Sequence, residues 1–221
     1  MKKITLFSIL AVLFAAMSFT SCNTDGDSGM NYLTLEQQKN YQYAMAAGSY
    51  NNMTLLYEKK NDANVKNQTD SVASSCSISM YGDSTMTMTN FPVAALAEHI
   101  SDKDLAAVIA KELPRTIKCK YNVMPYSTSE IAYFIACPEA INLDLTYGTD
   151  NKSHKVVLYF IPIIPGNIYY GYCTLKEPRQ LGFQFALYQI WVDGNQTNFI
   201  QNSINTSYTT VSFAFRNAWK K

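Results

Sequence analysis

Apolar and polar side chains alternate along most of the chain with a period of two, which is typical of half-buried β-strands. Met53, Leu55 and Tyr57 share one face of the first such segment, and Phe213 and Phe215 alternate in the last. Strands are predicted over residues 49–58, 71–81, 84–90, 115–124, 129–137, 140–147, 154–163, 168–175, 181–192 and 207–216. We therefore expect a mainly β (α+β) fold, either an antiparallel β-sandwich or an open barrel.

Two or three short helices interrupt this alternation. Thr34, followed three residues later by Gln37, has the spacing of a capping box and predicts a helix that runs to residue 46. Two more helices are predicted over residues 93–100 and 101–113, and Ser101 is the expected N-cap of the second.

The N-terminus has the three parts of a secretory signal. Lys2 and Lys3 precede an uncharged apolar run over residues 4–17, and a small-residue segment ends at Cys22. The apolar run is shorter than the roughly 20 residues that a permanent transmembrane helix needs. The segment over residues 19–22 resembles a lipobox, which implies a signal peptide over residues 1–21 and a diacylglyceryl group on the Cys22 sulfur.

The residues that follow Cys22 are small, polar and acidic, and they predict a flexible tether over residues 22–33. A single β-rich domain would then occupy residues 34–221. Position 23 is Asn rather than the Asp that retains many lipoproteins at the inner membrane. We expect an outer-membrane location with the protein facing either the periplasm or the cell surface.

Charge limits the partners of the mature chain. Removal of residues 1–21 takes away two lysines, so Lys+Arg falls from 18 to 16 against 17 acidic residues. A net charge of −1 gives no electrostatic reason to expect a nucleic-acid partner. The lipid anchor would make the membrane a partner, and a glycan or another protein is a further possible partner.

Four cysteines remain in the predicted domain, at positions 76, 119, 137 and 173. An oxidising compartment permits two disulfides, with three possible connectivities. Cys76 and Cys119 both alternate with apolar residues on strands, which favours buried free thiols.

Two sets of short motifs resemble known families. The helix that runs into residues 47–50, the strands that close on residues 89–92 and the helix over 101–113 together resemble a family of uncharacterised Bacteroidetes lipoproteins, a domain of unknown function. This resemblance implies a lineage and an envelope address but no activity. The pairs Gly48-x-Tyr50 and Asn90-Phe91 resemble calycin-like β-barrel lipoproteins of the same bacteria, which implies an antiparallel β core.

The sequence has few motifs of enzymes or metal proteins. Its two histidines, His99 and His154, are far apart, and no His or Cys spacing is typical of zinc or haem. No cofactor is expected, and the interpretation leans away from an enzyme. A hydrolase remains an alternative that requires His99 or His154 in a pocket beside an acid or a nucleophile.

Aromatic residues beside amides suggest a binding surface. Trp191 precedes a polar loop that contains Asn195, and Tyr170 and Tyr172 follow a turn. Rings can stack on sugar faces while amides bond the hydroxyls, so these four residues are candidate ligand-binding residues for a glycan. The main prediction is a non-enzymatic binding or interaction domain of a cell-envelope lipoprotein. A calycin-like carrier of a small apolar ligand is a second alternative, with a cavity lined by Met53, Leu55, Ile78 and Met80.

Overall fold

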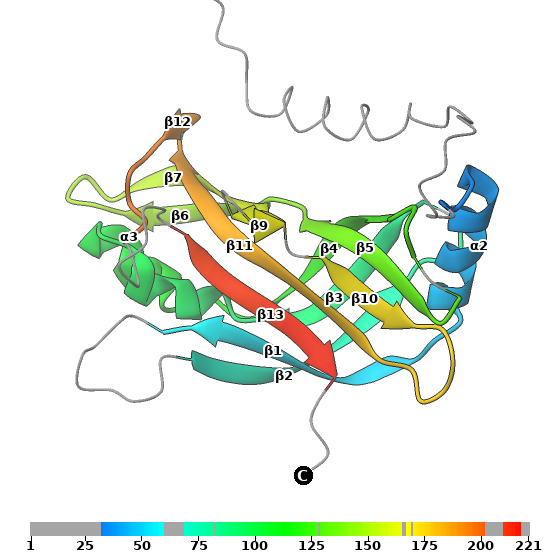
Figure 1. Cartoon of the computed structure of the whole chain (residues 1–221). Helices are drawn as coiled ribbons and strands as arrows, with labels where there is room; N and C mark the ends of the chain where they lie inside the picture. The colour runs from blue at the N-terminus through cyan, green and yellow to red at the C-terminus, as the bar shows by residue number, and fades with distance from the viewer. Residues whose placement is uncertain are drawn as a thin grey trace, which may run out of the picture.

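The computed structural model describes residues 32–59, 69–81, 83–127, 129–164, 167–168, 170–201 and 210–217. The predicted signal peptide, the lipidation site Cys22 and nearly all of the predicted tether lie outside these residues. Figure 1 shows a barrel of strongly tilted strands with helices at both of its ends.

The predicted capping box is present at the first helix. Helix α2 spans Leu35–Ala46. The Gln37 backbone N–H donates to the Thr34 hydroxyl (3.2 Å), and the Thr34 N–H donates to the Gln37 side-chain oxygen (2.8 Å). These two bonds satisfy backbone donors that a helix start leaves without intrahelical partners.

Strands account for most of the described chain. They are β1 (Tyr50–Glu58), β2 (Thr69–Ile78), β3 (Thr85–Phe91), β4 (Arg115–Val123), β5 (Ile131–Pro138), β6 (Ile141–Tyr147), β7 (Lys152–Ile161), β8 (Ile163–Ile164), β9 (Asn167–Ile168), β10 (Gly171–Thr174), β11 (Leu181–Val192), β12 (Asn195–Gln196) and β13 (Val211–Asn217). The mainly β prediction is therefore confirmed. The three shortest strands, β8, β9 and β12, contain too few residues to show a period.

Eight of these strands close into an antiparallel barrel. Their order is β10-β5-β4-β3-β2-β1-β13-β11, and β11 pairs back to β10. The prediction of a sandwich or an open barrel is corrected by this closing pair. Alternation reports which face of a strand is buried, but it does not report which distant strand lies beside it.

Strands β6 and β7 extend the sheet beyond the barrel. β10 pairs with the first two residues of β11, and β7 pairs with the second half of β11. β10 and β7 therefore follow one another along the same edge of β11. The short β8–β9 hairpin lies between them in the chain. Strand β7 therefore lies inside the sheet, with β6 on one side and β11 on the other.

Helices cover the two ends of the barrel (Figure 1). α2 packs against β2 and β4 at one end, while the 3₁₀ helix η1 (Val93–His99) and helix α3 (Lys103–Ile109) lie at the other. The N-cap of α3 is Asp102 rather than the predicted Ser101, because the Asp102 carboxylate accepts the Leu105 N–H (2.8 Å). The Ser101 N–H and hydroxyl instead donate to the Phe199 carbonyl.

Aromatic rings fill the middle of the barrel. Phe91 lies 5.0 Å from Phe213 and 5.5 Å from Phe160, and Phe185 stacks on Phe213 at 5.2 Å, all between ring centroids. Four strands therefore contribute to one set of ring contacts. Such pairs add about 0.5–1.5 kcal/mol each beyond the apolar area that they bury.

Three of the four residues predicted to line a carrier's cavity belong to this core. Met53, Leu55 and Ile78 are buried in it. Met80 is 57% exposed, so its predicted place in the interior is wrong. It follows the end of β2, where alternation no longer reports an inward face. None of the helices that the structure describes is both long enough and apolar enough to cross a bilayer.

Candidate binding site

A tight turn between β11 and β12 organises one end of the sheet. Asp193 has a φ of 48° and Gly194 a φ of 77°. An Asp-Gly pair with two positive φ values is the combination that a two-residue hairpin of primed type requires. The turn brings Asn195 back opposite Val192, and Gln196 opposite Trp191.

Trp191 lies on the outer face of this part of the sheet. Its indole N–H donates to the Gln189 side-chain oxygen (3.0 Å), and its ring meets Tyr159 edge-on at 5.7 Å. Tyr159 is the cross-strand partner of Gln189, and Gln196 is the partner of Trp191. We call Tyr159, Gln189, Trp191 and Gln196 the Trp191 face. It joins two half-buried rings to two amides on one surface.

His154 and Asp193 form a hydrogen-bonded pair beside this face. His154 Nδ1 lies 2.7 Å from Asp193 Oδ2, and the Lys155 N–H donates to Asp193 Oδ1 (2.9 Å). Because a carboxylate only accepts, Nδ1 carries the proton. The bond from His154 lowers the pKa of the Asp193 carboxyl. The His154 ring is half-buried and packs at 4.7 Å against the Tyr147 ring.

His99 has a structural role. Its ring is buried, and Nε2 lies 2.9 Å from the Glu58 carbonyl oxygen, which accepts the ring N–H. The bond ties the end of η1 to the end of β1. Among the residues that the structure describes, no three His, Cys, Asp or Glu side chains are grouped to hold a metal ion.

The four domain cysteines are free thiols, and three of them are buried. Burial raises the pKa of Cys76 to about 12 and that of Cys137 to about 11. The Cys173 sulfur lies 3.1 Å from the Tyr50 hydroxyl oxygen. The Tyr50 hydroxyl donates to the Met45 carbonyl (2.9 Å). Neutral thiols in these surroundings are poor nucleophiles.

A second aromatic group lies on the outer face of β5 and β10. Tyr133 and Tyr172 are cross-strand partners, and the Tyr126 ring lies 6.1 Å from Tyr133 and 5.7 Å from Tyr170. We call these four residues the tyrosine patch. Tyr126, Tyr170 and Tyr172 are 38–45% exposed. Burial and a hydrogen bond with Tyr170 raise the pKa of Tyr126.

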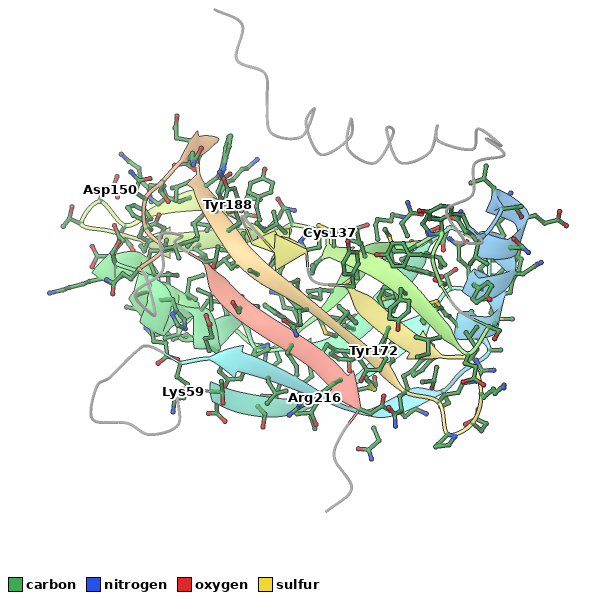
Figure 2. All side chains as sticks on the ribbon, viewed as in Figure 1. Lys59, Cys137, Asp150, Tyr172, Tyr188 and Arg216 are labelled. Carbon is green, nitrogen blue, oxygen red and sulfur yellow. The ribbon has the colours of Figure 1, made fainter. Side chains whose placement is uncertain are left out.

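The structure divides the four predicted ligand-binding residues between these two places. Trp191 and Asn195 lie near the β11–β12 turn, whereas Tyr170 and Tyr172 belong to the tyrosine patch. Tyr172 pairs with Gly182, nine residues before Trp191 on the same strand. At roughly 3.3 Å per residue the two groups are about 30 Å apart. Figure 2 labels Tyr172 beside the first part of β11 and Tyr188 toward the other end of that strand.

Several residues of these two groups were not predicted from the sequence. Tyr159, Gln189 and Gln196 complete the Trp191 face, and Tyr126 and Tyr133 complete the tyrosine patch. The alternation of β7 and β5 places Tyr159 and Tyr133 on outward faces, and that signal was available. Their proximity to Trp191 and Tyr172 depends on strand pairing, which alternation does not report.

The fold thus defines a class: a closed eight-strand antiparallel barrel with helices at both ends and two aromatic groups on its outer surface. The chain belongs to the family described as Domain of unknown function (DUF4840), which matches residues 45–192. That range runs from the end of α2 to the end of β11 and includes the tyrosine patch and all of the Trp191 face except Gln196. No curated protein and no solved structure matches the chain.

Proposed function

We propose that this protein is a lipid-anchored protein of the cell envelope whose barrel binds a glycan at the Trp191 face without catalysing a reaction. The observation that carries the proposal is the pairing of rings with amides on one outer surface. Trp191 and Tyr159 supply ring faces, and Gln189 and Gln196 supply donors and acceptors beside them. Pyranose rings have the same combination of an apolar face and a hydroxyl rim.

The hydrogen bond between Trp191 and Gln189 supports this assignment. It uses the only polar group of the indole, so the ring itself meets a ligand as an apolar surface. It also holds the ring in one orientation, which lowers the entropy lost when a ligand binds. Asn195 is exposed on β12, where its side-chain amide donates to the Asp193 carbonyl (3.2 Å), and its cross-strand partner is Val192, the neighbour of Trp191.

The envelope address rests on Cys22 and on the signal that precedes it. The proposed location is the outer membrane, on either its periplasmic or its outer side. A Bacteroidetes lineage and a calycin-like ancestry are part of the same proposal. The calycin-like ancestry is supported by the closed eight-strand barrel, in which β1 begins at Tyr50 of Gly48-x-Tyr50 and β3 ends at Phe91 of Asn90-Phe91.

The binding test uses the unlipidated domain and a panel of soluble polysaccharides and peptidoglycan fragments. Trp191→Ala should weaken binding at least tenfold, and Tyr159→Ala should weaken it less. Tyr43→Ala is the matched control, because Tyr43 is an exposed tyrosine on α2, far from the Trp191 face. Glycan binding that is unchanged in Trp191→Ala would refute the assignment. Cys22→Ser should abolish acyl labelling and release the protein from membranes, and unchanged labelling would refute the anchor.

The bond between His154 and Asp193 favours a second candidate, a hydrolase. The carboxylate holds the proton on Nδ1, which leaves Nε2 as a possible general base. A chromogenic ester or glycoside panel tests it: turnover that His154→Ala abolishes would establish it, and turnover by neither protein would remove it. The carrier alternative has less support, because phenylalanine rings occupy the middle of the barrel.

A further inference from the structure

The tyrosine patch lies directly beside the point where the chain enters the barrel from its N-terminal side. The Leu33 backbone N–H donates to the Pro125 carbonyl (2.6 Å), and Pro125 precedes Tyr126 of the patch. The Gln38 side chain holds the Leu33 carbonyl (3.1 Å), so Leu33 is fixed on both of its sides. Tyr32, the residue before this anchor point, is 59% exposed.

The length of chain between Cys22 and this point limits how far the patch can be from a membrane. Residues 23–33 are eleven residues, which span at most about 36–40 Å when fully extended. The Trp191 face lies about 30 Å farther along β11. An anchored chain therefore keeps the patch end within about 40 Å of the bilayer, and the Trp191 face lies about 30 Å from the patch.

The chemistry of the patch suits the boundary between headgroups and hydrocarbon. Each tyrosine combines an apolar ring with a hydroxyl, and tyrosine is enriched at membrane–water interfaces for that reason. The charges beside the patch are paired, since Lys176 Nζ lies 2.8 Å from Glu130 Oε1. Contact between tyrosine side chains and a bilayer depends on rings and hydroxyls that lie together at the boundary between headgroups and hydrocarbon. Such contact does not require anionic lipid.

We infer that the tyrosine patch is a lipid-contact surface that rests on the headgroup region of the membrane holding the anchor, so that the Trp191 face points away from that membrane. This inference rests on the proposed lipid anchor at Cys22. It adds to the anchor an orientation of the barrel relative to the membrane. It also gives separate roles to the two aromatic groups, because only the distant one is then accessible to a large glycan.

The test places an environment-sensitive fluorophore at each end of the acylated full-length mature chain. Tyr170→Cys introduces a reactive thiol in the patch, and Asn195→Cys introduces the matched control on β12. Acylation blocks the Cys22 sulfur, and burial raises the pKa of each of the four native domain thiols, which slows their reaction at neutral pH. Each protein is labelled with a nitrobenzoxadiazole probe and reconstituted into vesicles of phosphatidylethanolamine and phosphatidylglycerol. Mass spectrometry of the N-terminal peptide reports acylation in the same samples.

The expected result is a several-fold rise and a blue shift of emission for the probe at position 170, with water-like emission at position 195. High salt should leave the signal unchanged, and Tyr126→Ser with Tyr172→Ser should reduce it. Water-like emission from both probes on an acylated chain would overturn the contact and leave the anchor standing. A shift only at position 195 would reverse the orientation and overturn the inference. A response at position 170 to soluble glycans but not to vesicles would also overturn it, and absence of acylation would refute the anchor and the contact together.

Discussion

Gly171 and Gly182 each lie under an aromatic ring from the neighbouring strand, one inside the barrel and one outside. A Cβ at Gly171 would lie 2.4 Å from the ring of Phe134, its cross-strand partner. A Cβ at Gly182 would lie 2.7 Å from the ring of Tyr172, also its partner. Substitution by alanine therefore forces a ring to move at both positions, and the two rings differ in their freedom to do so.

The expected costs follow from the surroundings of each ring. Carbon atoms in contact are about 3.5–4.0 Å apart, so Phe134 must shift by roughly 1 Å. Phe134 is fully buried and meets the rings of Tyr121 and Phe183 at 6.0 Å each. Overpacking of this kind costs about 1–3 kcal/mol, and the loss of glycine freedom in the unfolded chain offsets about 0.4–1 kcal/mol. Gly171→Ala should therefore lower the free energy of unfolding by about 0.5–2.5 kcal/mol.

Gly182→Ala is the matched control. Tyr172 is 38% exposed and can swing toward solvent, so the cost and the gain should nearly cancel. Urea denaturation of both variants measures the difference. For a chain of this size 1 kcal/mol shifts Tm by about 2–4 °C, which gives a fall of about 1–10 °C for Gly171→Ala. Equal destabilisation by both substitutions, or none by Gly171→Ala, would refute the argument from ring freedom.

Three further predictions follow from single contacts. Asp102→Ala removes the N-cap of α3 and should lower the free energy of unfolding by about 0.5–2 kcal/mol in thermal denaturation, while neighbouring Lys103→Ala should change it little. His154→Ala should raise the pKa of Asp193 in an NMR titration, and an unchanged pKa would show that the bond between them does not form. Because the pKa of Asp193 is lower in the folded protein, the stabilisation from this pair is present above about pH 4 and is lost as the pH falls. Burial raises the pKa of the Cys76 thiol from 9.0 to about 12. The contribution of this thiol to the free energy of unfolding is therefore complete below pH 9 and is lost as the pH rises toward 12. At pH 8 a thiol reagent should modify Cys76 only at the rate of unfolding, and immediate modification would contradict its burial.

Local patterns predicted the elements of this fold well. The capping box at Thr34 and Gln37 placed α2 to within one residue, and alternation placed β4 and β11 at nearly their observed bounds. These signals lie within a few residues of one another in the chain. The local sequence likewise predicted Ser101 as the N-cap of α3. Asp102 is the N-cap instead, because Ser101 donates to the carbonyl of Phe199, which is far away in the chain.

The arrangement of the candidate site depends on contacts that no local pattern contains. Trp191 and Tyr159 are 32 positions apart and meet because β11 pairs with β7 past a bulge. His154 reaches Asp193 because the end of β11 lies beside the start of β7, where the Asp193 N–H donates to the Lys155 carbonyl (2.9 Å). Barrel closure has the same origin, since only the pairing of β10 with β11 separates it from an open sheet.

That closing pair is also the shortest of the barrel, because β10 meets β11 through two residue pairs, Tyr172 with Gly182 and Cys173 with Leu181. Local unfolding begins where few backbone hydrogen bonds resist it, so this seam is where native fluctuations open the barrel first. Cys173 lies in the seam with its thiol inward against Tyr50, whereas Cys76 and Cys119 belong to longer pairings. The modification rate of Cys173 is therefore a gauge of barrel breathing, and those of Cys76 and Cys119 are gauges of global unfolding.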